Sequence, residues 1–315
     1  MTPFNALQFI KRLSALGERQ LETETQAANL IRAVLNEYQL NFVEQKYLVD
    51  IPRFVKHRLL IDDERIDSLP TGLVSGAITK QNKILSSLIS SQLNINDANI
   101  NYSEVCPTIS KNNFYHAPAL AINFKDLDKI KNAITIKGEI EVERANHEAI
   151  NFLIGNIESP KHILFCHYDS WGPGAIDNAS GTALLLKLAI CNRAFLDSGL
   201  FVIAANEEIS YDYPVYWGHG YRVFENLYRN QMIAANQLIV VDCVGHAHPV
   251  ITQEEHEVLL GFPIKDIKQH LHKTKMIYAD LDFLMTVYHS KLDLPDNIKP
   301  EFLHQTYRNI LELIA

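Results

Sequence analysis

Hydrophobic residues recur along the chain with two periods, one typical of helices and one of strands. Near the N-terminus, apolar positions recur every three to four residues over 4–16 and again over 23–35, which predicts two amphipathic helices. The segment from Asn41 to Val49 has the composition of a strand. The last segment, 300–314, begins with a proline and has one apolar face, which predicts a closing amphipathic helix.

Four short runs of consecutive apolar residues predict buried strands, because a strand covered on both faces does not alternate. A His, Asp or Glu follows each run within two residues. The runs are Ile163–Cys166, Leu200–Ala205, Leu238–Val241 and Phe283–Tyr288. If these strands are parallel neighbours, their carboxyl ends meet at one edge of a sheet, where ligands bind in open α/β proteins. The pattern therefore predicts one site built from all four strand ends.

The region from 51 to 137 differs from the rest of the chain in its pattern of apolar and polar residues. Short β-rich pieces alternate with polar stretches there, and a strand followed by a short helix is predicted over 117–130. We interpret 51–137 as a small β-rich inserted domain, so that 1–50 and 138–315 form the main domain. Strands at Ile134–Val142 and Ala149–Ile157 lead back into that main domain.

Composition narrows the classes of protein. The chain has 315 residues, a net charge of −8 and no block of Lys or Arg, so binding to nucleic acid or to an anionic membrane is not expected. The four cysteines include no CxxC pair, which disfavours zinc ribbons and a disulfide framework. The N-terminus lacks the pattern of a signal peptide, and no apolar run approaches the roughly 18 residues of a membrane span. A cytoplasmic α/β protein is the expectation.

The residues after the apolar runs include two His, two Asp and two Glu. They are His167, Asp169, Glu207, Glu208, Asp242 and His289. So many ionisable groups exceed what acid–base chemistry needs, and crowded carboxylates need cations between them, so we interpret the set as a two-metal site. His167 and Asp169 are two apart and face one side of a strand, so Asp169 can hold the second ring nitrogen of His167. Glu207 and Glu208 point opposite ways, so one can bind metal while the other faces water.

Each of these signals is weak alone. Adjacent glutamates such as Glu207 and Glu208 are usually a solvated pair, and a lone Asp242 or His289 is more often a loop cap or a satisfied surface residue. Cys166 and Cys243 adjoin two of the candidates, but strand alternation is expected to turn both thiols into the core. The combined pattern is what favours a metal site.

At these residues the chain resembles the co-catalytic zinc exopeptidase family, which includes bacterial leucyl aminopeptidases, glutamate carboxypeptidases and glutaminyl cyclases. The resembling pieces follow the order of the family. They are HYDS at 167–170, GAIDNASG at 174–181, NEE at 206–208, VVDCVG at 240–245 and YHSKLD at 288–293. The segment ALGERQLETETQAANLIRAVL (15–35) resembles the N-terminal helices of the family, and APALAINFKDLDKI (117–130) resembles the end of a protease-associated insert.

The resemblance implies a fold, a cofactor and residue roles. The fold class is α/β: a three-layer α/β/α zinc-peptidase domain with a mixed, mostly parallel central sheet and a protease-associated-like insert. Two zinc ions per chain are implied, with Asp177 bridging them. His167 and Asp242 would complete one ligand set, and Glu208 and His289 the other. Glu207 would be the general base, and Asp169 the partner of His167.

The predicted function is a zinc-dependent aminopeptidase that acts on the free N-terminus of peptides, with no expectation about oligomeric state. The loop Ile209–Trp217 is longer than in most aminopeptidases of the family and resembles the cyclases. The ten-residue step from His167 to Asp177 resembles the carboxypeptidase branch. Glutaminyl cyclase or carboxypeptidase activity on the same site is therefore an alternative. A non-enzymatic binding relative is another, but it predicts damaged ligand positions, and none is damaged.

Overall fold

The computed structural model describes residues 3–87 and 95–314, which fold into two compact units. The first unit comprises Met1–Val49, His147–Leu284 and Asp293–Ala315. The second comprises Asp50–Asn146 and Met285–Leu292. Two strands of 20 residues, β1 (Phe42–Ile61) and β8 (Ile136–Gly155), carry the chain from one unit into the other.

The sheet of the first unit has a parallel centre. Strand β9 (His162–His167) lies between β10 (Gly199–Ala204) and β11 (Gln237–Val241), and β13 (Thr274–Tyr278) follows beyond β11. All three pairings are parallel. The antiparallel strands β12 (Val250–Thr252) and β8 flank this centre, and β1 pairs beyond β8. The sheet is thus mixed, as predicted.

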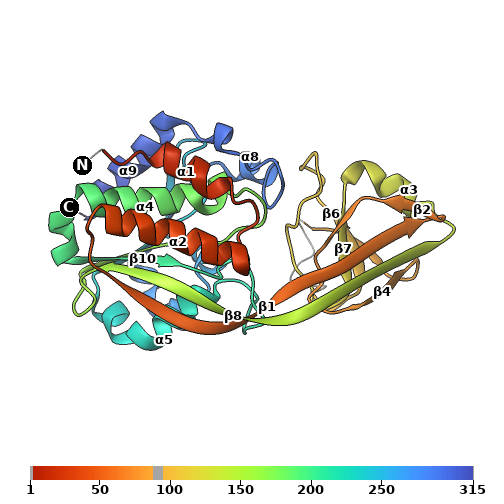
Figure 1. Cartoon of the computed structure of the whole chain (residues 1–315), viewed down its shortest axis with the longest axis horizontal. Helices are drawn as coiled ribbons and strands as arrows, with labels where there is room; N and C mark the ends of the chain where they lie inside the picture. The colour runs from red at the N-terminus through yellow and green to blue at the C-terminus, as the bar shows by residue number, and fades with distance from the viewer. Residues whose placement is uncertain (1–2, 88–94, 315) are drawn as a thin grey trace. The chain divides into compact units, whose positions relative to one another are not determined.

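Helices cover both faces of this sheet (Figure 1). One face carries α1 (Ala6–Ser14), α2 (Glu22–Glu37), α4 (Ser180–Cys191) and α9 (Pro300–Ile314). The other carries α5 (His219–Ala234) and α6 (Glu255–Gly261), with the short α7 (Ile267–His270) following in the chain. This three-layer α/β/α arrangement confirms the predicted fold class. Within residues 3–87 and 95–314, no helix has the length and apolar character that crossing a membrane requires.

An aromatic cluster joins the sheet to α5. The ring of Phe165 on β9 lies 5.9 Å from Tyr221 and 5.4 Å from Phe224 of α5, and 4.7 Å from Phe262 (centroid distances). All four side chains are fully buried. Burial of one such side chain contributes about 1.5–3 kcal/mol, so this cluster holds β9, and the residues at its end, rigidly in place.

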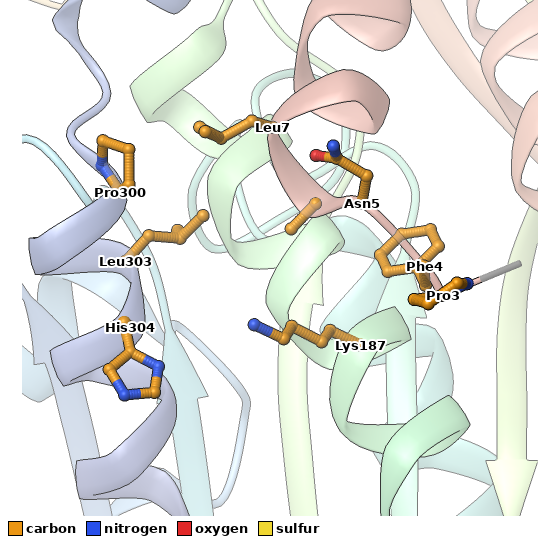
Figure 2. Close-up of a pocket in the computed structure, with 9 residues that line it drawn as sticks. Pro3, Phe4, Asn5, Leu7, Lys187, Pro300, Leu303 and His304 are labelled. Atoms are coloured by element: carbon orange, nitrogen blue, oxygen red, sulfur yellow. The ribbon is translucent and has the colours of Figure 1, made fainter.

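The N-terminal segment, α4 and α9 converge around a shallow hollow of about 300 Å³ (Figure 2). Phe4 and Leu7 line it from the N-terminal segment, Lys187 from α4, and Leu303 and His304 from α9. The Lys187 amino group lies 4.8 Å from the ring of Tyr307, a cation–π distance. Among the described residues that line this hollow, none is a predicted site residue.

The structure corrects one predicted strand. Residues 283–288 do not form a strand: α8 (Leu281–Met285) occupies their start and a turn their end. A helix starts here because Asp280 caps its N-terminus: an Asp280 side-chain oxygen accepts a hydrogen bond from the Phe283 N–H at 3.1 Å. The apolar run by itself does not indicate this cap. The fourth parallel strand is β13, which precedes this helix. The strands predicted at Ile134–Val142 and Ala149–Ile157 belong to the single strand β8, which is two residues shorter at each outer end.

The second unit has its own sheet and core. Strands β1 and β2 (Glu64–Ile66) form a hairpin, β4 (Gly76–Thr79) pairs with β8, and a separate sheet has the order β3-β7-β6-β5. That sheet contains β3 (Ser68–Pro70), β5 (Lys83–Ser86), β6 (Asn99–Tyr102) and β7 (Ala119–Ile122). A 3₁₀ turn (Phe124–Asp126) and α3 (Leu127–Lys131) follow β7, which confirms the predicted strand and short helix. Buried Ile and Leu side chains from β1, β2, β4, β6, β7, α3 and β8 form one core.

Candidate active site

The pairing of three parallel strands brings the candidate residues together at the carboxyl ends of those strands. In β9, His167 lies opposite Ala204, the last residue of β10, and Phe165 lies opposite Val240 of β11. Because paired strands advance together, the residues that follow β10 and β11 lie beside the end of β9. These are Asn206–Glu208 after β10 and Asp242 after β11. The predicted meeting of strand ends is therefore realised for three of the four runs.

His167 is the centre of a buried cluster of carboxylates. Its Nε2 lies 3.2 Å from Oδ1 of Asp177, 3.4 Å from Oδ1 of Asp242 and 4.0 Å from Oε2 of Glu207. Asp177 comes from the turn Ala175–Ala179 that precedes α4. All of these side chains are buried, so little water is present to screen their charges.

Two sets of possible ligand atoms overlap at Asp177. One atom from each of His167, Asp177 and Glu208 lies within 4.8 Å of the others, and the same holds for Asp177, Asp242 and Cys243. In a tetrahedral zinc site with bonds of about 2.0–2.1 Å, neighbouring ligand atoms are roughly 3.3 Å apart. The distances from His167 Nε2 to Asp177 and Asp242 match that spacing, at 3.2 and 3.4 Å. An imidazole and carboxylates at these separations fit zinc.

Asp169 holds the other side of this cluster together. Its Oδ1 lies 3.4 Å from Nδ1 of His167, on the side opposite the carboxylates that face Nε2. The same carboxylate accepts hydrogen bonds from the backbone N–H groups of Glu207 and Glu208, both at 3.0 Å. Asp169 therefore fixes both the imidazole and the turn that presents the two glutamates.

Burial and like charges shift the ionisation of the site. Burial raises the pKa of Glu207 well above its usual value, and the nearby carboxylates Glu208 and Asp242 add to this, while His167 opposes it. Burial alone would lower the pKa of His167, but Asp242, with Asp169 and Asp177, outweighs this effect and raises it well above its usual value. The cluster therefore favours a cation near His167, whether protons or a metal supply the charge.

Two residues outside the predicted set fix the turn that carries Asp177. The Asp293 carboxylate accepts hydrogen bonds from the backbone N–H groups of Ile176 (2.8 Å) and Asp177 (3.0 Å). Burial raises the pKa of Asp293 to about 7. The fully buried Arg19 donates to the carbonyl oxygens of Tyr168, Pro173 and Gly174 at 2.5, 2.7 and 3.1 Å. Both residues lie in segments that resemble the family, YHSKLD and ALGERQ, which is the signal that could have identified them.

A third buried carboxylate supports the glutamate turn from α2. Glu24 is only 1% exposed, and its Oε2 accepts a hydrogen bond from the Asn206 side-chain amide at 2.7 Å. Its Oε1 lies 3.0 Å from Nε2 of His147. Asn206 has a φ of 47°, a left-handed conformation in which a specific side-chain contact is valuable. Sequence reasoning placed Glu24 only within an amphipathic helix.

His289 belongs to the second unit, so six of the seven predicted site residues lie in the first. Its Nδ1 lies 3.1 Å from the carbonyl oxygen of Lys111, and its backbone oxygen accepts from the Lys111 N–H at 3.0 Å. The contact with a carbonyl requires the proton on Nδ1, which leaves the Nε2 lone pair to bind a metal. His289 is 6% exposed, and its ring stacks on Tyr288.

Cys243 is buried, as predicted, but its thiol lies beside the site residues Asp177 and Asp242. Strand alternation was expected to turn it into the core, but β11 ends at Val241 and Cys243 has a φ of 52°, so alternation no longer applies. Its Sγ lies 3.3 Å from Oδ1 of Asp242. Cys166 behaves as predicted: it is fully buried, with its Sγ 3.9 Å from the hydroxyl oxygen of Thr182.

One segment of the chain matches a known peptidase family. Residues 153–210 match the sequence model of peptidase family M28, a segment that contains His167, Asp169, Asp177, Glu207 and Glu208. This match over 58 of the 315 residues, together with the shared fold, supports the predicted kinship with the co-catalytic zinc exopeptidases. Zinc as the cofactor agrees with the family and with the donor set. No curated protein sequence matches the chain.

Solved structures share the fold at low sequence identity. A zinc aminopeptidase from Bacillus subtilis is 16% identical, with a TM-score of 0.69 over 98% of this chain and 94% of its own. A peptidase M28 precursor from Shewanella amazonensis is 13% identical, with a TM-score of 0.67 over 98% and 92%. A glutaminyl cyclase from Fimbriiglobus ruber is 12% identical, with a TM-score of 0.55 over 100% and 96%. At these identities the likeness is one of fold.

Proposed function

We propose that the protein is a zinc-dependent aminopeptidase that removes the N-terminal residue of peptides. The observation that carries the proposal is that Asp177 adjoins a proposed ligand of each ion: its Oδ1 lies 3.2 Å from His167 Nε2, and one of its carboxylate oxygens lies within 4.8 Å of a carboxylate oxygen of Glu208. The second supporting feature is the Glu207 carboxylate, whose Oε2 lies 4.0 Å from the proposed ligand atom of His167. A carboxylate beside metal ligands is placed to act as the general base of peptide hydrolysis.

The proposed ligands divide between two zinc ions. Asp177 would bridge them, His167 and Asp242 would complete the ligands of one, and Glu208 and His289 those of the other. Zinc at this site would supply a Lewis acid and make a water molecule more acidic. The Nδ1–H groups of His167 and His289 are held by Asp169 and by the Lys111 carbonyl, so Nε2 is the nitrogen available in both.

The residues of the chain would handle the proton. Glu207 would accept a proton from the attacking water and then donate it to the amine that leaves. Burial raises the pKa of Glu207, and a higher pKa helps the carboxyl group to keep the proton between the two steps. Asp169, which accepts the N–H of Glu207, would hold this carboxylate at one position throughout.

Replacing Glu207 by Gln tests this assignment. We expect the zinc-loaded wild type to cleave at least one member of an aminoacyl substrate panel, and Glu207→Gln to lose roughly a hundredfold or more of kcat. Both proteins should contain about two zinc ions per chain. Measuring the metal content beside the rate separates loss of the base from loss of the ligands. A variant that keeps its zinc and its rate would remove Glu207 from the mechanism.

Glutaminyl cyclase activity is the second candidate. Two observations favour it: the similar fold of the Fimbriiglobus ruber glutaminyl cyclase, and the long loop Ile209–Trp217 between the glutamate turn and α5. A peptide with N-terminal glutamine, assayed for ammonia release beside the aminoacyl panel and a peptide with C-terminal glutamate, distinguishes cyclase and carboxypeptidase activity from the proposed one. Peptides as partners, a cytoplasmic location and the protease-associated nature of 51–137 stay predictions.

A further inference from the structure

The second unit contains a hollow of about 660 Å³, which is lined by residues of that unit alone. Its volume falls in the range of ligand pockets, roughly 300–1,000 Å³. The lining includes four cationic side chains: Arg58, Arg65, Lys125 and Lys291. Two carboxylates, Asp67 and Asp126, also line it, so four positive charges face two negative ones in a chain whose net charge is −8.

The cations of this hollow differ from most others in the unit. Lys56, Lys83, Lys129, Lys137 and Arg144 each lie within 4.0 Å of a carboxylate. In contrast, the side chains of Arg65, Lys125 and Lys291 have no hydrogen bond or ion pair among the described residues, although Asp67 and Asp126 line the same hollow. These cations are exposed. They are therefore available to a negatively charged ligand.

The wall of the hollow is continuous with the segment that holds His289. Pro107–Ile109 line the hollow, and the next two residues bind the His289 loop: the Ser110 hydroxyl donates to the Tyr288 carbonyl at 2.6 Å, and the Lys111 carbonyl contacts the His289 ring. Lys291 lies two residues beyond His289, a Cα separation of at most about 7 Å. The hollow thus adjoins the one predicted zinc ligand that the second unit supplies.

We propose that this hollow binds a carboxylate of the peptide substrate, so that the enzyme prefers peptides with a negative charge a few residues beyond the N-terminus. The proposal rests on the proposed function, which places the substrate N-terminus at the zinc ligands. A peptide extends by about 3.3–3.6 Å per residue, so the other two residues of a tripeptide whose first residue lies near His289 reach roughly 7 Å further. The C-terminal carboxylate of a short peptide and an acidic side chain present the same chemistry to Arg and Lys.

Three tripeptide substrates test the preference. They share their first residue, which is the best one from the aminoacyl panel: the free acid X-Gly-Gly, its C-terminal amide, and the amide X-Gly-Glu-NH₂. For the zinc-loaded wild type we expect kcat/KM for the free acid to exceed that for the amide by about tenfold, mostly through KM, as binding by charged hydrogen bonds predicts. The preference should weaken as salt is raised, because the cations are exposed. The glutamate amide shows whether an acidic side chain can replace the terminal carboxylate.

The matched variants are Arg65→Gln with Lys125→Gln, and Lys131→Gln as control. Lys131 is an exposed cation at the end of α3 that does not line the hollow. The double variant should lose the preference for the free acid while its kcat/KM for the amide is unchanged, and the control should behave as the wild type does. Equal kcat/KM for free acid and amide in the wild type, or a preference that survives in the double variant, overturns the proposal.

A binding measurement tests the carboxylate site in the hollow independently of the proposed aminopeptidase activity. If the panel is not cleaved at all, the aminopeptidase assignment fails, and Gly-Gly-Gly and its amide are titrated into the zinc-free protein by calorimetry. Tighter binding of the free acid by several-fold, lost in the double variant, still supports a carboxylate site in the hollow. Equal binding of acid and amide rejects it.

Discussion

The buried Glu24 makes a prediction that can be worked through to a magnitude. Glu24 is 1% exposed on α2, where its carboxylate faces His147 and the Asn206 amide. Burial raises its pKa from 4.5 to about 7, and the negative charge of Asp169 adds to this, whereas His147 and Asn206 oppose it. In the variant Glu24→Gln, an amide of the same size can still accept the hydrogen bond of Asn206 but never carries a charge.

The sign of the effect follows from proton binding. Between pH 4.5 and 7 the folded protein keeps a proton on Glu24 that the unfolded chain has lost, so the free energy of unfolding falls as pH rises. This contribution is fully present below pH 4.5 and is lost as pH rises through about 7. A shift of about 2.5 pKa units at 1.36 kcal/mol per unit gives roughly 3 kcal/mol, of which about 2–3 kcal/mol is lost between pH 5 and 8.

Urea unfolding of the zinc-free proteins at pH 5, 6, 7 and 8 measures this contribution. All other ionisable groups are common to wild type and Glu24→Gln, so the difference between the two pH profiles reports Glu24 together with its effect on His147, whose pKa Glu24 raises. We expect the variant to gain about 2–3 kcal/mol relative to wild type between pH 5 and 8. Glu37→Gln, which removes an exposed carboxylate at the end of the same helix, should follow the wild-type profile. Parallel profiles for wild type and Glu24→Gln would falsify the reasoning.

Other predictions concern the supports of the site and the core. Asp169→Ala should reduce zinc affinity or kcat/KM by about 10–100-fold, because the carboxylate orients the His167 imidazole and the glutamate turn. Metal competition and steady-state kinetics measure the two quantities, and unchanged values would contradict this role. Asp293→Ala leaves two buried N–H groups without an acceptor and should cost about 2–6 kcal/mol in urea unfolding, and Asp293→Asn less. Phe165→Ala should cost about 3–5 kcal/mol in the same assay, and a loss below about 1 kcal/mol would show that the aromatic cluster collapses around the gap. Removing zinc with a chelator should lower the melting temperature, because carboxylates lose the cation between them.

The sequence alone determined the elements that depend on short windows. The apolar runs of β9, β10 and β11 are buried strands, as their unbroken hydrophobicity predicts, and the amphipathic periods of α1, α2 and α9 are helices. The helical patterns are the consequence of 3.6 residues per turn, and the unbroken runs are the consequence of strands that are buried on both faces. The chemistry at the strand ends was visible for the same reason, because His167 and Asp242 directly follow such runs and Glu207 follows one after a single intervening residue.

The tertiary structure decided what depends on contacts between distant residues. The order β10-β9-β11 differs from the order along the chain, and only pairing register brings Asp242 level with His167. Glu24 contacts Asn206 across 182 residues, and no local period could indicate that contact. Likewise the run before His289 reads as a strand in isolation, yet an Asp280 cap makes its first part a helix. The spacing of hydrophobic residues indicates which face of a helix or strand is buried. The segment that packs against that face is determined by the packing of the whole fold.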